Sequence, residues 1–318
     1  MKAANLDIVV IMDGPDTVDA ATDTSFGLMV AARERGHDVW HCTANAISLS
    51  DGSVRAQAHR AIIDEASSWA PLTLGEPADL DLGAVGAVLV RPDPPFDLAY
   101  LHLTLLLDHL IGQTPVINAP RGLRDANEKL YALRFPEITP PTIVTADADH
   151  LHAFAQTQGG AVIKPIEGHG GRGVILLRPD DPNGASIVDT MTARGQTPVV
   201  AQRFLPGVRD GDKRILLLDG EPLGAILRRP TDADFRANIC VGGSVEAVEV
   251  DEADRRVIAA IAPSLKADGL VFVGIDVIDG YLSEVNVTSP TGLRQLSQLA
   301  GTRPDLDVIE WIERAIRR

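Results

Sequence analysis

The stretch GHGGRG, residues 168–173, restricts the fold more than any other part of this 318-residue chain. Its glycines Gly168, Gly170 and Gly173 match the pattern GxGxxG, but the dinucleotide-binding loop with that pattern needs a strand before it and a helix after it. Here the apolar run VILLR and a proline follow the loop, and this composition predicts a strand. A glycine-rich loop between two strands covers the phosphates of ATP in protein kinases, so we predict a phosphate-binding loop of that kind.

A lysine next to this loop supports the interpretation. Lys164 lies on the strand predicted at residues 161–166, and its ammonium could reach the same phosphates as a point charge. The glycines, Gly171 included, allow backbone N–H groups to approach phosphate oxygens closely. No GK[ST] follows, so the loop is not of the Walker A type. The alternative is a glycine-rich β-turn beside a surface lysine.

Residues 274–292 predict a β-hairpin that carries three oxygen-bearing side chains. Two runs rich in Val and Ile flank an Asp-Gly dipeptide, which supplies the positive φ angles of a tight hairpin turn. Asp276 precedes the turn, and Glu284 and Asn286 follow it two residues apart, on one face of a strand. Oxygen ligands of this kind suit Mg²⁺. The alternative is a half-buried strand with polar residues on its solvent-exposed face.

The first 120 residues alternate strand and helix patterns. Strands are predicted at residues 6–12, 37–42, 87–91 and 115–118, and helices at residues 25–35 and 97–110. This alternation predicts an α/β domain with a doubly wound parallel sheet, whose ligands bind at the carboxyl ends of the strands. Arg91 lies at the carboxyl end of one of these strands, where a loop with three prolines begins. The prolines stiffen this loop, and Arg91 could hold a substrate carboxylate. A proline-rich crossover with a solvated arginine is the alternative.

The rest of the chain predicts two further units. The predicted elements are one helix at 121–135 that contains Lys129, strands at 143–144, 161–166 and 174–178, a helix at 149–158, a hairpin that turns at 219–220, and helices at 252–267 and 305–317. An extended segment with Gln202, Phe204 and Leu205 could hold an adenine ring between two lobes. The polar segment 230–243 predicts a lid, and a merely mobile loop is the alternative.

Composition excludes several classes of protein. The chain has 44 acidic and 29 basic residues, a net charge of −15 and no basic run, so a nucleic-acid partner is not expected. Its two cysteines, Cys42 and Cys240, are far apart, which argues against a disulfide framework or a zinc ribbon. Neither a signal-peptide pattern nor an unbroken apolar run of membrane-spanning length occurs, and we expect a cytoplasmic globular protein. The hydrolase motifs GxSxG and HExxH do not occur either.

Eight motifs, spread over nearly the whole length, carry a resemblance to a known family. They are TSFGL (24–28), RPDPPFD (91–97), LRDANEKL (123–130), IKPIEGHGGRGV (163–174), AQRFLP (201–206), DGDKR (210–214), GLVFVGIDVI (269–278) and EVNVTSPTG (284–292). In this order they resemble the bacterial glutathione synthetases of the ATP-grasp superfamily. The resemblance implies an N-terminal α/β substrate domain (1–122), a small ATP-grasp lid domain (123–200) and a C-terminal ATP-grasp domain (201–318), with ATP between the last two.

The resemblance also implies roles for individual residues. ATP would be bound by Lys129, Lys164, Gly168, Gly170, Gly171, Gly173, Gln202, Phe204, Leu205 and Asp212. Mg²⁺, with Mn²⁺ as an alternative, would be bound by Asp276, Glu284 and Asn286. The catalytic arginines would be Arg214, Arg228 and Arg236. Substrates would contact Arg91, Asn238, Ser289, Pro290 and Thr291, with Arg236 and Asn238 on the loop that closes over the site.

The implied reaction is an ATP-dependent ligation in glutathione biosynthesis. The carboxylate of γ-glutamylcysteine forms an acyl phosphate with ATP, and glycine then displaces phosphate to give glutathione. The resemblance further implies a cytoplasmic homotetramer with small-molecule substrates and no membrane partner. Two departures from the family pattern, Arg172-Gly173 in the glycine loop and an acidic lid segment at 231–243, lie near the substrate mouth. Another ATP-grasp ligase with different substrates and a non-catalytic nucleotide-binding regulator therefore stay open as alternatives.

Overall fold

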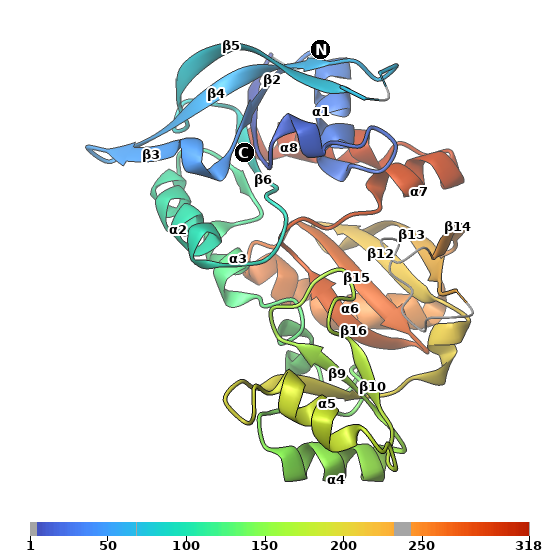
Figure 1. Cartoon of the computed structure of the whole chain (residues 1–318). Coiled ribbons are helices and arrows are strands. Elements are labelled where there is room, and N and C mark those ends of the chain that lie inside the picture. The colour runs from blue at the N-terminus through green and yellow to red at the C-terminus, as the bar shows by residue number, and fades with distance from the viewer. Residues whose placement is uncertain (1–4, 68, 232–242, 318) are drawn as a thin grey trace.

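A computed structural model describes residues 5–67, 69–231 and 243–317. The described residues form three β-sheets, of seven, four and five strands. The seven-stranded sheet lies at one end of the molecule and the four-stranded sheet at the other, with the five-stranded sheet between them (Figure 1). In the part of the chain that the structure describes, no helix is both long enough and apolar enough to cross a membrane.

The first sheet contains the predicted parallel core. Its strands are β1 (Asp7–Ile11), β2 (Asp38–Cys42), β6 (Ala87–Val90) and β7 (Val116–Ile117), and its helices are α1 (Thr24–Glu34) and α2 (Leu98–Leu107). Alternate residues of β1 enter two different clusters: Ile8 and Val10 pack with α1, and Val9 and Ile11 pack with α2. Because β1 is buried on both faces, its sequence is a continuous apolar run. The predicted strands and helices of this region are confirmed.

The first sheet is mixed rather than wholly parallel. The strands β3 (Ile47–Ser50), β4 (Ser53–Ile63) and β5 (Leu72–Asp81) extend it through antiparallel pairs, and none of the three was predicted. Residues of β4 do alternate between buried and exposed positions, but two of its buried side chains are Ala56 and Ala58. Alanine gives a weak apolar signal and a low strand propensity, so the alternation is hard to see in the sequence.

The second sheet holds the glycine loop. Its strands, in spatial order, are β10 (Ile175–Leu177), β9 (Ala161–Pro165), β11 (Val199–Arg203) and β8 (Thr142–Thr145), and all neighbours are antiparallel. The helices α4 (Ala148–Gln158) and α5 (Gly184–Met191) pack on one face of this sheet. Residues 166–174 connect β9 directly to β10, so the predicted strand–loop–strand arrangement is confirmed.

The helix predicted at residues 121–135 is wrong. The structure has the short helix α3 (Pro120–Asp125), a turn that contains Lys129, and a 3₁₀ helix at Tyr131–Arg134. Asn127 explains the interruption, because its Oδ1 accepts hydrogen bonds from the backbone N–H groups of Lys129 and Leu130, both at 3.1 Å. A side chain that bonds nearby backbone in this way competes with the helical pattern.

The third sheet contains both predicted hairpins. Its spatial order is β14 (Ser244–Val248), β13 (Glu221–Arg229), β12 (Asp212–Leu218), β15 (Phe272–Ile278) and β16 (Tyr281–Asn286), all antiparallel. Both Asp-Gly turns have positive φ at both residues, 51° and 75° at 219–220 and 51° and 74° at 279–280. These angles belong to the type I′ turn that the sequence predicts.

The C-terminal helices complete the structure. Helix α6 (Glu252–Ala267) starts with a capping box between Asp251 and Asp254, as its predicted N-cap implies. Helix α8 (Pro304–Ile316) was predicted, whereas α7 (Leu293–Ala300) was not. Both pack against α1 and against the third sheet (Figure 1), and α8 is joined to the end of α1 by an ion pair of 2.7 Å between Arg35 and Glu313. Further 3₁₀ helices span Pro15–Thr17, Ala44–Ala46, Asp108–Leu110 and Pro206–Arg209.

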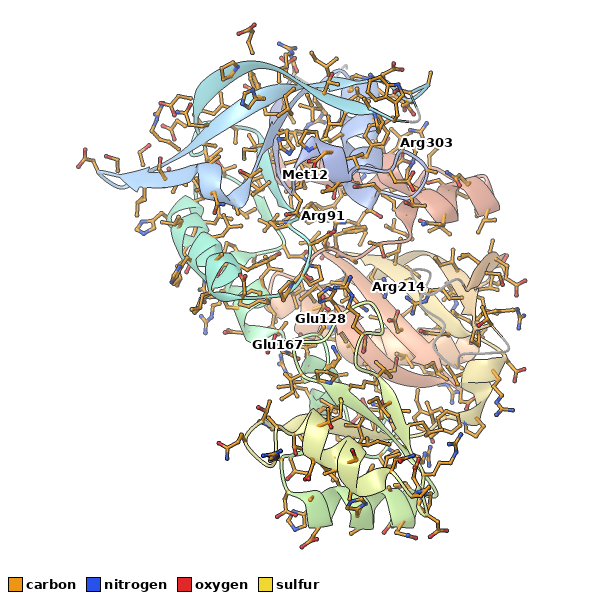
Figure 2. All side chains as sticks on the ribbon, in the orientation of Figure 1. Met12, Arg91, Glu128, Glu167, Arg214 and Arg303 are labelled. Carbon is orange, nitrogen blue, oxygen red and sulfur yellow. The ribbon has the colours of Figure 1, made fainter. Side chains whose placement is uncertain are left out.

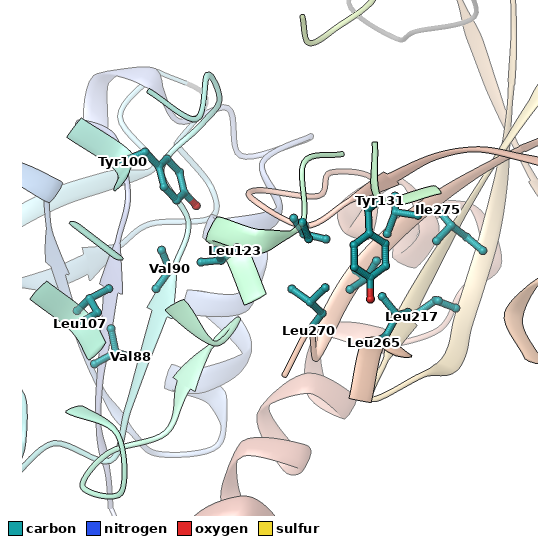
Figure 3. Close-up of a cluster of buried hydrophobic side chains, with 14 of the residues drawn as sticks. Val88, Val90, Tyr100, Leu107, Leu123, Tyr131, Leu217, Leu265, Leu270 and Ile275 are labelled. Atoms are coloured by element: carbon teal, nitrogen blue, oxygen red, sulfur yellow. The ribbon is translucent and has the colours of Figure 1, made fainter. Parts of the chain in front are cut away.

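One buried cluster continues from the first sheet into the third. Figure 3 shows Val88 and Val90 of β6 on one side and Leu217 and Ile275 of the third sheet on the other, with Leu123 of α3 between them. The two sheets are therefore held in a fixed relation by apolar burial. This relation also fixes Arg91, which follows β6 of the first sheet, against the segment that follows β16 of the third.

Candidate active site

A cleft of about 770 Å³ lies between the second and third sheets. Val162, Lys164 and Gln202 form its wall on the second sheet, and Asp276 and Glu284 form its wall on the third. The glycine loop between β9 and β10 closes a further side. The cleft is therefore lined by residues of both sheets and of the glycine loop.

The structure brings most of the predicted nucleotide-binding residues to this cleft. Those that line it are Lys129, Lys164, Gly168, Gly170, Gly171, Gln202, Phe204, Leu205 and Asp212. Gly173 does not line the cleft, although its neighbours Arg172 and Val174 do. Gly173 has a φ of 69°, so it serves the loop through its backbone conformation.

The two predicted phosphate lysines reach the cleft from different segments. The ammonium of Lys164 lies 3.3 Å from Oε1 of Gln202 and 3.7 Å from Oε1 of Glu284. Lys129 is 5% exposed and donates a hydrogen bond to the carbonyl oxygen of Gly168. Lys129 is therefore bound to the glycine loop itself, a contact that the sequence does not predict.

The three predicted metal ligands lie together on the hairpin. Asp276 and Glu284 face each other across the β15–β16 pair, and Nδ2 of Asn286 lies 3.3 Å from Oδ2 of Asp276. Two carboxylates and an amide form an oxygen donor set that fits a hard divalent cation. Among the residues that the structure describes, no group of three His, Cys, Asp or Glu side chains is arranged to hold a metal. The amide of Asn286 would thus be needed as the third protein ligand.

Two buried arginines flank this group. Arg214 donates to both oxygens of Asp276, at 2.5 and 2.9 Å, and also to the carbonyl oxygen of Thr291 at 3.3 Å. Arg228 pairs with Asp212 at 2.5 Å and with Asp276 at 3.0 Å. Burial alone would raise the pKa of Asp276, but the two arginines hold it well below its usual range. Asp276 therefore stays ionised as a metal ligand should.

Asp212 lies in the same buried cluster and behaves differently. Burial raises its pKa to about 6, an effect that Arg228 opposes and Asp276 reinforces. For Arg228, burial lowers the pKa, and the attraction of Asp212 and Asp276 outweighs it, so the net direction is upward. The cluster holds two arginines and two aspartates, and Asp212 is the aspartate whose pKa is raised.

The predicted substrate residues form a second group, next to the cleft rather than in it. Arg91 is 4% exposed, so the alternative of a solvated arginine is wrong. Its Nε donates to Oγ of Ser25 and its Nη2 to the carbonyl oxygen of Pro290, both at 3.0 Å. Oγ of Ser289 donates to the carbonyl oxygen of Arg91 at 3.3 Å. Arg91 thus ties the N-terminal sheet to the segment that carries Ser289, Pro290 and Thr291.

Part of the prediction falls outside the described residues. Arg236, Asn238 and Cys240 all lie there, together with most of the predicted lid. Their roles stay predictions.

A second cavity of about 560 Å³ adjoins the cleft. Both cavities are lined by Lys129, Gly168 and His169, which form the wall between them. Glu128 and Glu167 also line the second cavity, on the side where the glycine loop approaches the third sheet (Figure 2). Neither glutamate was singled out from the sequence, because their partners lie far away along the chain and leave no local pattern.

Two family profiles match the chain, one after the other. The prokaryotic glutathione synthetase N-terminal domain matches residues 6–124, and the prokaryotic glutathione synthetase ATP-grasp domain matches residues 128–301. The chain belongs to the prokaryotic glutathione synthetase family. The predicted membership of this family is therefore confirmed.

Relatives of the glutathione synthetase family align over nearly the full length. The glutathione synthetase of Thermosynechococcus vestitus is 45% identical over 316 residues, which cover 96% of this chain and 99% of the relative. That of Nostoc sp. is 42% identical and covers 98% of each chain. That of Rhodopseudomonas palustris is 42% identical and covers 96% of this chain and 97% of the relative.

Solved structures with low sequence identity share the fold. The ATP-grasp ligase PsnB, in complex with minimal precursor, Mg and ADP, has a TM-score of 0.65 at 18% identity and covers 99% of this chain and 100% of that one. The D-alanine–D-alanine ligase of Bacillus anthracis, in complex with ATP, has a TM-score of 0.57 at 20% identity and covers 98% and 99%. The predicted α/β ATP-grasp fold is confirmed, and the glutathione synthetase family makes the chain an ATP-dependent ligase.

Proposed function

We propose that this chain joins γ-glutamylcysteine to glycine at the expense of ATP and so makes glutathione, ADP and phosphate. The observation that carries the proposal is the match to glutathione synthetases at 40–45% identity over nearly the whole chain. The geometry agrees with it, since one cleft combines two lysines, a glycine loop and a carboxylate pair. A different carboxylate–amine ligase is not favoured by these relatives.

The reaction runs in two steps that conserve every atom. An oxygen of the donor carboxylate attacks the γ-phosphorus of ATP, the bond to the β-phosphate oxygen breaks, and ADP leaves. The resulting acyl phosphate is then attacked at its carbonyl carbon by the glycine amine. Phosphate departs with the oxygen that came from the carboxylate, and the amine nitrogen loses a proton. Phosphoryl transfer of this kind depends mainly on positioning and on neutralising charge.

The cleft residues supply positioning. Lys129, Lys164 and the glycine loop would bind the ATP phosphates through ammonium groups and backbone N–H groups. Gln202, Phe204 and Leu205 would contact the adenine end, since β11 and the segment after it line the cleft there.

The third sheet would neutralise charge. Asp276, Glu284 and Asn286 would hold Mg²⁺, or Mn²⁺ in its place, and the bound cation would neutralise charge on the phosphates. Arg214 and Arg228 lie directly against this group, where their guanidinium groups would stabilise the phosphoryl group in transfer and the acyl phosphate.

The substrates would bind beside this group. Arg91 and the segment that holds Ser289, Pro290 and Thr291 would contact the peptide and glycine, with Arg214 joined to the same segment. Arg236 and Asn238 would close over them and keep water from the acyl phosphate.

We further propose a three-domain organisation (1–122, 123–200 and 201–318), a homotetramer and a cytoplasmic location. Family membership supports all three. For the first, the sheet changes between β7 and β8 and again between β11 and β12, so the second change comes after residue 203, since β11 spans Val199–Arg203. Light scattering on the purified protein gives the assembly directly, and a dimeric or monomeric mass would contradict the homotetramer.

The experiment that tests the function measures ADP release with ATP and Mg²⁺ while γ-glutamylcysteine and glycine are omitted in turn. We expect release only when both are present, with a product of glutathione mass. Release that needs a different amine would keep the ATP-grasp chemistry and contradict the proposed acceptor. A rate of ADP release that does not depend on γ-glutamylcysteine or on any added amine would contradict a ligase of this specificity.

A further inference from the structure

Three consecutive residues, Asn127, Glu128 and Lys129, contact two different parts of the candidate site. Nδ2 of Asn127 lies 3.4 Å from Oε1 of Glu167 at the start of the glycine loop. The ammonium of Lys129 bonds to the carbonyl oxygen of Gly168 in the same loop. Glu128, between them, turns to the third sheet. This tripeptide therefore joins the glycine loop to the metal-site hairpin.

Glu128 makes a dense set of contacts with the end of that hairpin. Its Oε1 accepts hydrogen bonds from Oγ1 of Thr288 at 2.8 Å, from the N–H of Val287 at 3.2 Å and from the N–H of Thr288 at 3.4 Å. Its own carbonyl oxygen accepts from the N–H of Val285 at 2.9 Å. One residue thus binds the chain on both sides of Asn286.

These hydrogen bonds of Glu128 lie at the end of strand β16. Strand β16 stops at Asn286, so the N–H groups of the next two residues have no strand partner there, and the carboxylate of Glu128 accepts from both. A carboxylate that accepts two backbone N–H groups and a hydroxyl is held firmly, since bonds to a charged acceptor are stronger than neutral ones. Asn118 adds one more bond, from its Nδ2 to the carbonyl oxygen of Val287.

The direction of the two side chains separates their roles. Asn286 points to Asp276, in the cluster where the metal ligands meet. Glu128 lines the second cavity and is not among the residues that line the 770 Å³ cleft. Its bonds to the N–H groups of Val285 and Val287 place Glu128 at the edge of β16 that is not paired with β15.

We propose that Glu128 is a positioning residue whose carboxylate fixes Val287 and Thr288, and with them the adjacent Asn286, for binding of the divalent cation. The inference rests on the proposed metal site, and it assigns to Glu128 no contact with the metal or with ATP. It also links two parts of the site, because the neighbouring Lys129 is a proposed phosphate ligand. A shift at 128 would therefore move a metal ligand and a phosphate ligand together.

The test compares Glu128→Gln with Glu128→Ala. Glutamine keeps an oxygen that can accept from Thr288 and the two N–H groups, while alanine removes every side-chain contact. Loss of a residue that orients a metal ligand commonly costs about 10- to 100-fold in metal affinity, so we expect Glu128→Ala to raise the half-saturating Mg²⁺ concentration by about that factor. Glu128→Gln should stay within about threefold of the wild type, since the loss of one charge weakens bonds that it still makes.

A readout that does not need turnover separates this inference from the proposed function. Hydrogen–deuterium exchange of the free protein should become faster at Val287 and Thr288 in Glu128→Ala and stay close to wild type in Glu128→Gln. Thr288→Val, which removes the shortest of the three bonds, should change exchange and Mg²⁺ dependence in the same direction by a smaller factor. Glu137→Ala, at an exposed glutamate in the same connecting region, is the matched control.

Two results would overturn the inference. If Glu128→Gln is as defective as Glu128→Ala, the negative charge itself is required, and Glu128 acts as a ligand or a base. If Glu128→Ala is folded and shows wild-type exchange and Mg²⁺ dependence, the carboxylate does not fix the strand. Failure of the wild type to release ADP would instead count against the proposed function and leave the exchange result standing.

Discussion

Replacement of Asn118 by alanine should destabilise the protein strongly. Asn118 is 3% exposed and lies at the end of β7, next to the strand that carries Asp276. Its Nδ2 donates to the carbonyl oxygens of Phe272 and Val287, and its Oδ1 accepts from the N–H groups of Val271 and Phe272, all at 2.8 Å. These four bonds fasten the metal-site hairpin to the N-terminal sheet.

The size of the effect follows from what alanine would leave behind. Two N–H groups, of the half-buried Val271 and the buried Phe272, and two buried carbonyl oxygens would lose their side-chain partner, and each such loss costs about 1 kcal/mol or more. We therefore expect a loss of about 4 kcal/mol in the free energy of unfolding, well above the roughly 1 kcal/mol typical of a point substitution. At about 2 °C per kcal/mol for a large domain, the midpoint should fall by about 8 °C.

The assay is thermal unfolding of Asn118→Ala beside Asn45→Ala. Asn45 is an exposed residue of the same sheet region, so its replacement should change the free energy of unfolding by less than about 0.5 kcal/mol. A fall in midpoint no larger for Asn118→Ala than for Asn45→Ala would refute the reasoning, because the four bonds would then carry no net stability.

Three further predictions follow from single residues. Glu284→Gln should reduce turnover strongly but change the free energy of unfolding by less than about 1 kcal/mol, because its ion pair with Lys164 is long, 3.7 Å. Kinetics and thermal unfolding of one preparation check both, and undiminished turnover would remove Glu284 from the metal site. Burial raises the pKa of Asp212 from 3.8 to about 6, so the folded protein keeps a proton there that the unfolded chain releases. The free energy of unfolding of the wild type relative to Asp212→Asn should therefore fall as the pH rises from about 4 to about 6, and a difference independent of pH would contradict the shift. Cys42 is 2% exposed and burial raises its thiol pKa to about 12, so in a Cys240→Ser background a thiol reagent at pH 8 should label it only after denaturation, and rapid labelling of the folded protein would argue against its burial.

Local patterns account for the parts of the fold that were predicted correctly. The two Asp-Gly turns require positive φ, and their hairpins form where the sequence places them. The glycine loop was assigned to a strand–loop–strand unit because VILLR reads as a strand, and β10 (Ile175–Leu177) lies there. In such places the residues that determine the structure are neighbours in the chain.

The errors come from contacts that a local pattern does not contain. The helix predicted through Lys129 is broken by the side chain of Asn127, and the freed segment is held by Val285, far away in the sequence. The strands β3 to β5 are stabilised by pairing with one another and with β2, while their buried alanines give little apolar signal.

The same reason separates the expected site residues from the missed ones. The residue types of Lys164, Asp276 and Glu284 predict phosphate and metal binding, and the structure places all three in one cleft. The local sequence does not predict the roles of Glu128 and Asn118, because their hydrogen-bond partners are more than 150 positions away. Residues that orient a site through long-range hydrogen bonds become visible only in the folded structure.

The measurement that tests the central claim most directly follows one oxygen atom. γ-Glutamylcysteine labelled with oxygen-18 in its cysteinyl carboxylate is converted with glycine and ATP, and the released phosphate is examined by mass spectrometry. Activation of the carboxylate as an acyl phosphate predicts one labelled oxygen in each phosphate and one retained in the new amide. Phosphate without label, formed at the same rate as glutathione, would contradict an acyl-phosphate ligase.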